Sequence, residues 1–296
     1  MRPYCGVDSR ERAVESLWGL AVGDAFGERF FGPPWIMRRR IERRELPPAP
    51  WRWTDDTAMA VSLVRVLTEV GCVDQDALAG AFGAAYRADP DRGYGAGMHR
   101  LLPRYRDGGE WRELASGVFP GGSFGNGAAM RVAPLGAFFA GDPERAAAEA
   151  ALASEVTHAH PDGVAGGVAV AAAAALAAAG SPGSDAFLTR VLDHVPPGEV
   201  REGVARAREL GSGAGVRHAA RVLGSGSRIT ARDTVPFVLW SAARHLDRFE
   251  DALWETVAGL GDRDTTCAMV GGIVASGTGR AGIPRAWLEA TEPLAT

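Results

Sequence analysis

Two short acidic motifs, one near each end of the chain, carry the side chains best suited to metal chemistry. Each offers two carboxylates and a hydroxyl, from Thr54, Asp55 and Asp56 in the first motif and from Asp262, Asp264 and Thr265 in the second. These hard oxygen donors suit Mg²⁺ or Mn²⁺ rather than zinc, and neighbouring carboxylates repel one another unless a cation neutralises them. If the two motifs converge in the fold, they predict a site for one or two such ions. Both motifs also open a helical pattern, so simple helix capping is the structural alternative.

A glycine-rich loop at residues 120–127 runs into another helical pattern and offers backbone N–H groups to an anion. All 32 basic residues are arginine, so there is no lysine to form a Schiff base or to bind a nucleotide's phosphates. The only asparagine of the chain, Asn126, lies in this loop. We therefore predict a phosphate site built on backbone amides, with a polar role for Asn126. A turn that needs a left-handed residue is the alternative.

The segment from Gly19 to Glu28 combines small residues with two acids. Glycines at 19, 23 and 27 permit close helix packing. Glu28 directly follows the last of them and is a candidate catalytic or metal-supporting carboxylate, whereas Asp24 could equally be a buried structural acid.

The pair His158 and His160 has the form His-x-His, but the other histidines lack ligand-like spacing. We therefore interpret His158 as a capping or ligand-packing imidazole and His160 as a surface residue rather than as metal ligands.

Helical periodicity dominates the elements that must position these residues. The predicted helices cover residues 9–26, 55–70, 74–87, 128–139, 143–156, 164–179, 184–191, 199–210, 234–245, 249–258 and 264–276. No run of alternating β-branched residues predicts a strand. We expect an all-α fold in one compact domain over residues 1–296, with a core at about 9–290 and a loose tail from Thr291.

Composition excludes several classes of function. A net charge of −4 argues against a general nucleic-acid binder, and the arginine-rich run at 37–44 is expected to be a solvated helix face. Three scattered cysteines and a charged N-terminus fit a cytoplasmic protein without a signal peptide. Residues 162–185 lack an internal charge, but they are mainly alanine and glycine, which predicts a buried core helix rather than a membrane span. We expect a monomer with no membrane or nucleic-acid partner.

Five segments in this order resemble the ADP-ribosylglycohydrolase family, which includes the dinitrogenase reductase-activating glycohydrolases. The matching strings are GLAVGDAFGE, WTDDTAMA, GNGAAMRVAPLG, THAHP and GDRDTTCAMVGGIVA, which together span nearly the whole chain. The resemblance implies an all-α fold with a binuclear Mg²⁺ or Mn²⁺ centre in a cleft. It also implies hydrolysis of the N- or O-glycosidic bond between ADP-ribose and an acceptor, such as an arginine or serine side chain. An ADP-ribosylated nucleic acid stays open as an acceptor.

The resemblance also implies roles for individual residues. The metal ligands would be Thr54, Asp55, Asp56, Asp262, Asp264 and Thr265. The catalytic carboxylates would come from Asp55, Asp56, Asp264 and Glu28. The ADP-ribose site would be lined by Gly122, Ser123, Phe124, Gly125, Asn126, Gly127 and His158.

Two positions depart from the family pattern. The second acidic motif usually reads Asp-Thr-Asp, and here Arg263 stands in the middle. Family members often carry a glutamate where this chain has Phe31, so the role of Glu28 is less secure than that of the aspartates. Two other functions stay open: a metal-dependent hydrolase of a free nucleotide or an ADP-ribosylated small molecule, and a non-catalytic ADP-ribose binder.

Overall fold

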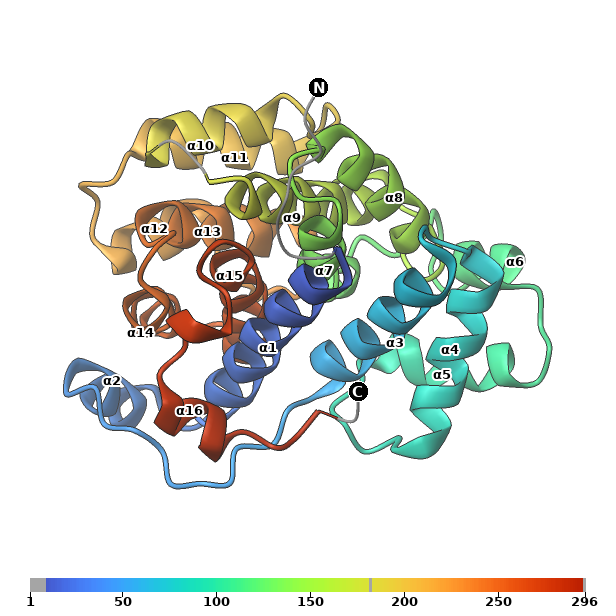
Figure 1. The fold of residues 1–296 in the computed structure, drawn as a ribbon, viewed down its shortest axis with the longest axis horizontal. Coiled ribbons are helices and arrows are strands. Elements are labelled where there is room, and N and C mark those ends of the chain that lie inside the picture. The colour runs from blue at the N-terminus through green and yellow to red at the C-terminus, as the bar shows by residue number, and fades with distance from the viewer. Residues whose placement is uncertain (1–8, 181–182, 295–296) are drawn as a thin grey trace.

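A computed structural model of the chain describes residues 9–180 and 183–294, and its regular structure there is helical apart from two isolated β-bridges (Figure 1). The elements are α1 (Ser9–Glu28), α2 (Pro34–Glu42), α3 (Asp55–Val70), α4 (Gln75–Ala88), α5 (Ala96–Arg106), α6 (Trp111–Gly117), η1 (Asn126–Ala128), α7 (Ala133–Phe138), α8 (Pro143–Glu155), α9 (Pro161–Ala178), α10 (Ser184–Leu192), α11 (Glu199–Leu210), α12 (Val216–Leu223), α13 (Ala231–Arg244), α14 (Phe249–Ala258), α15 (Arg263–Thr278), η2 (Arg280–Gly282) and α16 (Arg285–Ala290). The predicted all-α fold is confirmed.

Most helices predicted from periodicity are present, with ends shifted by a few residues. The expectation of one helix over 128–139 is wrong. That segment divides into the 3₁₀ turn η1 and the short helix α7, in whose first turn Pro134 lies. Four helices of eleven residues or fewer escaped prediction because their periodic signal is short: α5, α6, α12 and α16. The helix expected in the arginine-rich run is α2, and its Met37 and Ile41 are buried while its arginines face outward.

Helices α1 and α15 come from opposite ends of the chain and lie side by side along a stripe of glycine (Figure 1). A Cβ added at Gly23 would lie 2.1 Å from the carbonyl oxygen of Cys267, and one at Gly27 would lie 2.2 Å from that of Arg263. No larger residue fits without moving a backbone, so glycine is required here. The predicted close packing is confirmed, and it brings the start of α15 beside Asp24 of α1.

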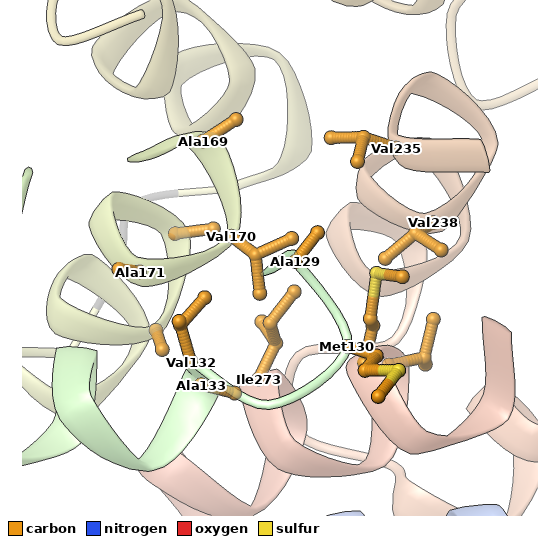
Figure 2. Close-up of a cluster of buried hydrophobic side chains, with 14 of the residues drawn as sticks. Ala129, Met130, Val132, Ala133, Ala169, Val170, Ala171, Val235, Val238 and Ile273 are labelled. Carbon is orange, nitrogen blue, oxygen red and sulfur yellow. The ribbon is translucent and has the colours of Figure 1, made fainter. Parts of the chain in front are cut away.

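Helix α9 forms part of the centre of the core. Figure 2 shows Val170 and its neighbours on α9 facing the segment 129–133, Val235 and Val238 of α13, and Ile273 of α15. Among the described residues, α9 is the one helix long and apolar enough to cross a membrane by length and composition, and it is mostly buried inside the fold. Its burial agrees with the prediction of a core helix.

The segment after α16 is held in place, contrary to the expected loose tail. The backbone N–H of Trp51 donates to the carbonyl of Ala290, and that of Glu292 donates to the carbonyl of Trp51. The Glu292 carboxylate also accepts hydrogen bonds from both terminal guanidinium nitrogens of Arg92, at 2.7 and 2.8 Å. Because Trp51 and Arg92 flank the first acidic motif, the C-terminal segment braces that motif.

Candidate active site

The two acidic motifs converge, and their side chains do not cap the helices that they begin. Thr54 and Asp262 occupy the N-cap positions of α3 and α15, yet neither side chain makes a capping hydrogen bond to a backbone N–H of its helix. The capping interpretation is therefore wrong for both residues. The Thr265 hydroxyl of α15 instead reaches toward the Asp56 carboxylate of α3, at 3.4 Å.

Asp24 on α1 is fully buried and orients the first acidic motif through hydrogen bonds. The Thr54 hydroxyl donates to it at 2.9 Å and the Thr57 hydroxyl at 2.5 Å, and the backbone N–H groups of both threonines also donate to it. Burial nevertheless raises the pKa of Asp24 to about 6, while these hydrogen bonds oppose the rise. Of the two roles left open for Asp24, the contacts show the buried structural one.

Four further aspartates, at positions 55, 56, 262 and 264, gather around the two helix starts. Burial raises the pKa of Asp55 to about 7, and the charge of Asp24 adds to the rise. Burial also raises the pKa values of Asp56 and Asp264 well above the usual range, and neighbouring carboxylates raise them further. The pKa of Asp262 is raised by burial as well, against hydrogen bonds that include one from Asn126. The cluster concentrates negative charge where water cannot disperse it.

The donor set fits a hard divalent cation. Oδ1 of Asp56 and Oδ1 of Asp264 are buried and have no hydrogen-bond partner. A buried carboxylate oxygen without a partner is costly unless a cation or a ligand supplies one. No three Asp, Glu, His or Cys side chains among the described residues enclose a point as a finished metal cage. The residues present thus fit the ions by the chemistry of their oxygen donors.

The glycine-rich loop reaches the same site through close backbone contacts. Gly122 has a φ of +84°, and a Cβ there would lie 2.5 Å from the backbone nitrogen of His160. The loop pairs with the segment before α13 through the N–H of Asn126, which donates to the carbonyl of Ile229, and through the N–H of Ala231, which donates to the carbonyl of Phe124. Glycine at position 122 therefore lets the loop pack directly against the backbone of Ala159 and His160.

Asn126 connects this loop to the second acidic motif. Its side-chain amide donates to Oδ2 of Asp262 at 2.7 Å and to the Thr234 hydroxyl at 3.1 Å. Its backbone begins the turn η1 and has no positive φ, so the alternative of a left-handed turn residue is wrong. The polar role predicted for Asn126 is therefore to orient Asp262 through a hydrogen bond.

His158 lies under the loop as a neutral base. Its Nδ1 is 2.7 Å from the Thr157 hydroxyl, which accepts a hydrogen bond from the buried guanidinium of Arg131. Burial lowers the pKa of His158 to about 3, and the Arg131 charge lowers it further. If Thr157 donates to Nδ1, the other ring nitrogen carries the proton beside Gly125 and Gly127. His160, in contrast, accepts from the N–H of Asp162 and caps α9, so capping belongs to His160 and not to His158.

These features surround a cleft of about 390 Å³. Of the residues singled out from the sequence, those in its lining are Asp55, Asp56, Asp262, Asp264, Thr265, Ser123, Phe124, Gly125, Asn126, Gly127 and His158. Gly122, Thr54 and Glu28 do not line this cleft. Thr54 and Glu28 instead line a second hollow of about 670 Å³, which shares Asp264 and Gly93 with the first. Part of the Glu28 side chain is exposed to solvent at that hollow, and the burial of the rest raises the pKa of its carboxyl group.

Several cleft residues are absent from the site residues predicted from the sequence. They come from three other segments: Gly93, Gly95, Ala96, Gly97 and Met98; Phe119; and Arg228, Ile229 and Thr230. The loop before α13 reaches the site because Gly226 and Gly261 allow it to approach, and a Cβ at Gly261 would lie 2.2 Å from the carbonyl oxygen of Ser225. The string GSGSR at residues 224–228 only hints at the positive φ of Gly224 and Gly226.

The fold and the site define an all-α protein whose cleft is lined both by a cluster of buried aspartates and by a glycine-rich loop. Sequence comparison makes the class specific, because the profile of the ADP-ribosylglycohydrolase family matches residues 6–295. The chain therefore belongs to the ADP-ribosylglycohydrolase family, whose members hydrolyse ADP-ribose linkages.

Individual relatives agree with this assignment. Human ADP-ribosylhydrolase ARH3 is 32% identical over 274 residues, covering 81% of this chain and 74% of its own length. The ADP-ribosyl-[dinitrogen reductase] glycohydrolase of Rhodospirillum rubrum is 27% identical, covering 96% and 91% of the two chains. A solved ADP-ribosylglycohydrolase-related protein complex superposes with a TM-score of 0.70 at 26% identity, covering 96% of this chain and 93% of its own.

Proposed function

We propose that this protein hydrolyses the glycosidic bond between ADP-ribose and an acceptor, using two Mg²⁺ or Mn²⁺ ions held by the acidic motifs. The observation that carries the proposal is the pair of uncapped helix starts, whose buried carboxylates face one cleft together with an anion loop. The ligands would be Thr54, Asp55, Asp56, Asp262, Asp264 and Thr265.

The chain's own residues divide the work between the two ends of the cleft. Backbone amides of the segment 123–127 would bind the diphosphate, apart from those of Gly125 and Asn126, which donate within the protein. These N–H groups would replace the lysine that the chain lacks. The neutral ring of His158 would pack and bond against the bound ADP-ribose. Asp262, oriented by Asn126, and Asp264 would lie by the distal ribose, where the bond breaks.

Hydrolysis requires charge stabilisation at the anomeric carbon and a route for one proton. When bound, the ions would neutralise the carboxylates, hold the ribose hydroxyls and lower the pKa of a water molecule. The buried aspartates would stabilise positive charge as the glycosidic bond stretches toward an oxocarbenium-like state. Asp55, Asp56 or Asp264 would accept a proton from water, and Glu28 is a candidate donor for the departing acceptor because it faces the second hollow.

Substitution of one ligand from each motif tests the proposal. Asp55→Ala and Asp264→Ala are each expected to abolish ADP-ribose release and to weaken Mg²⁺ binding in calorimetry. Without metal, both variants should unfold at the same temperature as the wild type or higher, because losing one buried carboxylate relieves repulsion within the cluster.

Asp193→Ala, an exposed aspartate after α10, is the matched control and should change none of these measurements. Full activity of Asp55→Ala or Asp264→Ala would overturn the proposed metal site. Release of ADP-ribose from arginine-modified, serine-modified and free small-molecule substrates, with and without Mg²⁺, would identify the acceptor. Tight ADP-ribose binding without turnover on any substrate would instead favour a non-catalytic binder.

A further inference from the structure

The segment around α2 exposes large apolar and basic side chains that the site does not use. Trp35 is 72% exposed, and Ile36 and Leu46 are each more than 40% exposed. Arg38 and Arg39 are exposed beside them. These five residues form what we call the α2 surface. Exposed tryptophan and isoleucine are costly in water, and together with arginine they are typical of the centre of a protein interface.

The α2 surface adjoins the second hollow of the site. The hollow is lined by chain on both sides of α2, namely Glu28, Arg29 and Phe31 before it and Ala49, Pro50 and Arg52 after it. Asp264 also lines the hollow, and it is one of the carboxylates of the first cleft. An acceptor whose ADP-ribose lies in the first cleft would therefore extend outward through this hollow and past α2.

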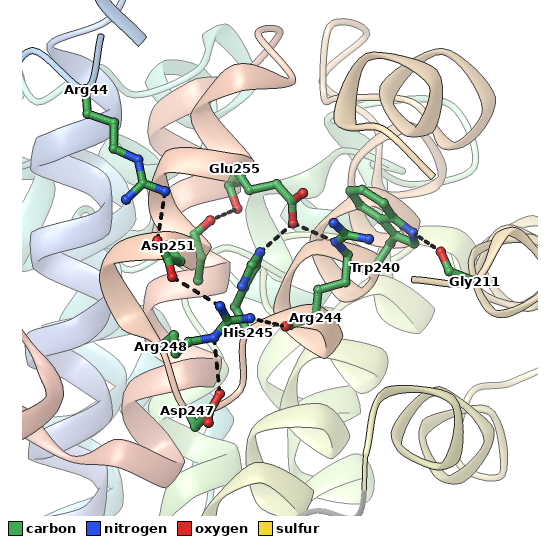
Figure 3. A network of polar contacts seen from close by, with 11 residues as sticks. Arg44, Gly211, Trp240, Arg244, His245, Asp247, Arg248, Asp251 and Glu255 are labelled. Atoms are coloured by element: carbon green, nitrogen blue, oxygen red, sulfur yellow. Dashed lines mark hydrogen bonds and ion pairs between the residues drawn. The ribbon is translucent and has the colours of Figure 1, made fainter. Parts of the chain in front are cut away.

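Helix α2 is held firmly enough to act as a platform. Met37 and Ile41 are buried on its inner face, and helical spacing places Trp35 and Arg39 on the opposite, outer face. Beyond its C-terminal end, the Arg44 guanidinium donates to the Asp251 carboxylate of α14 at 2.8 Å. Figure 3 shows this bond together with the contact between Asp251 and Arg248.

The charge of this surface differs from that of the molecule. The chain carries a net charge of −4, yet α2 and its flanks carry arginines at 29, 38, 39, 40, 43, 44 and 52. Within residues 9–180 and 183–294, no ion pair joins Arg38, Arg39 or Arg43 to a carboxylate. Arg44 and Arg52 in contrast do have acidic partners. The outer face of α2 thus presents positive charge that is available to a partner.

We propose that the α2 surface docks an ADP-ribosylated protein acceptor through an acidic patch next to its modified side chain. This inference rests on the proposed function. The side chain that bears ADP-ribose would enter the second hollow, Trp35 and Ile36 would contact apolar groups of the acceptor, and Arg38 and Arg39 would pair with its carboxylates. The apolar residues between the arginines, and the negative charge of the whole chain, favour a protein over a nucleic acid.

The test compares substrates that share one ADP-ribosylated side chain. They are a minimal ADP-ribosylated amino acid, a peptide in which acidic residues flank the modified side chain, and a peptide in which basic residues flank it. The wild type should prefer the acidic peptide. Arg38→Glu/Arg39→Glu should raise KM for that peptide about tenfold with kcat nearly unchanged, and salt should weaken the wild-type preference. Trp35→Ala should raise KM for the acidic peptide severalfold.

Turnover of the minimal substrate should be unchanged in both variants, which shows that they fold and that their sites are intact. Arg206→Glu/Arg208→Glu reverses two exposed arginines on α11, well away from α2 in Figure 1, and should leave every KM unchanged.

Equal KM values for the acidic and basic peptides in wild type and in the α2 variants would overturn the docking proposal while leaving hydrolysis intact. An ADP-ribosylated oligonucleotide whose KM alone depends on Arg38 and Arg39 would overturn it in favour of a nucleic-acid acceptor. If the wild type released ADP-ribose from none of the substrates, the proposed function itself would fall.

Discussion

Single residues at this site are held by partners far away in the sequence. Asp24 bonds to Thr54 and Thr57, which lie 30 and 33 residues further along the chain, and Asn126 bonds to Asp262. The side-chain chemistry at these positions could be predicted from residue type: hard oxygen donors, a lone asparagine, an imidazole near a ligand. The partners could not, since a pattern read along the chain does not show which side chains meet across it. Thr54 illustrates the limit, because its sequence context predicts a cap and its hydroxyl instead bonds to Asp24.

His158 makes the stability of the protein depend on pH. Its pKa is lowered to about 3 in the folded state, whereas an exposed histidine titrates near 6.5. Below about pH 6.5 the unfolded chain binds a proton that the folded chain does not, so the free energy of unfolding falls as pH falls. Between pH 7 and 4.5 this residue should contribute a loss of up to about 2.5 kcal/mol.

Urea unfolding at both pH values measures that contribution. His158→Gln cannot titrate, so it should lose less stability than the wild type over the same interval. Equal losses in the two proteins would show that His158 is protonated, or solvated, in the folded state.

At the scale of elements, the contact of α1 with α15 depends on glycine backbone. Gly23→Ala would place a Cβ 2.1 Å from the Cys267 carbonyl oxygen, so the helices must separate. The expected cost is about 1–3 kcal/mol of unfolding free energy. Because α15 begins with the second acidic motif, the variant should also lose the rise in melting temperature that the proposed metal site predicts for the wild type in Mg²⁺.

Gly80→Ala is the matched control for that experiment. Gly80 lies in α4 and has open space around it, so alanine should raise stability by about 0.5–1 kcal/mol through its helix propensity. Thermal melts with and without Mg²⁺ separate the two cases. A Gly23→Ala variant as stable as Gly80→Ala would contradict the close packing.

Long amphipathic or apolar helices were predictable because periodicity accumulates over several turns. The short elements were not, and they matter for the site. The predicted helix over 128–139 conceals η1, the turn that positions Asn126. The loop before α13 enters the cleft through positive-φ glycines at 224 and 226, and a Cβ at Gly226 would lie 2.5 Å from the side chain of Asp262, which is distant in the sequence.

At the scale of the whole molecule, the C-terminal segment supports the first acidic motif through Arg92. That guanidinium binds Glu292, stacks 3.7 Å from the Trp53 ring centre and donates to the Trp53 carbonyl, while the carbonyl of Arg92 accepts from the N–H of Asp55. Glu292→Ala should lower the free energy of unfolding by up to about 1 kcal/mol and raise the Mg²⁺ concentration needed for half-maximal stabilisation.

The fully exposed pair of Arg285 and Glu289 on α16 provides the comparison. Glu289→Ala should alter neither quantity measurably, because solvent screens that pair. If Glu292→Ala behaved like Glu289→Ala in metal titrations followed by thermal melts, the C-terminal segment would have no influence on the acidic motif.

The pairing of α1 with α15 also fixes the order in which the protein can be completed during synthesis. When α1 and the first acidic motif leave the ribosome, the helix that must cover the glycine stripe has yet to be translated. Asp264 and Thr265 of the second acidic motif emerge more than two hundred residues after Asp55. A nascent chain therefore carries only half of the aspartate cluster for most of its translation, and the cleft is completed only as the final helices fold back onto the first.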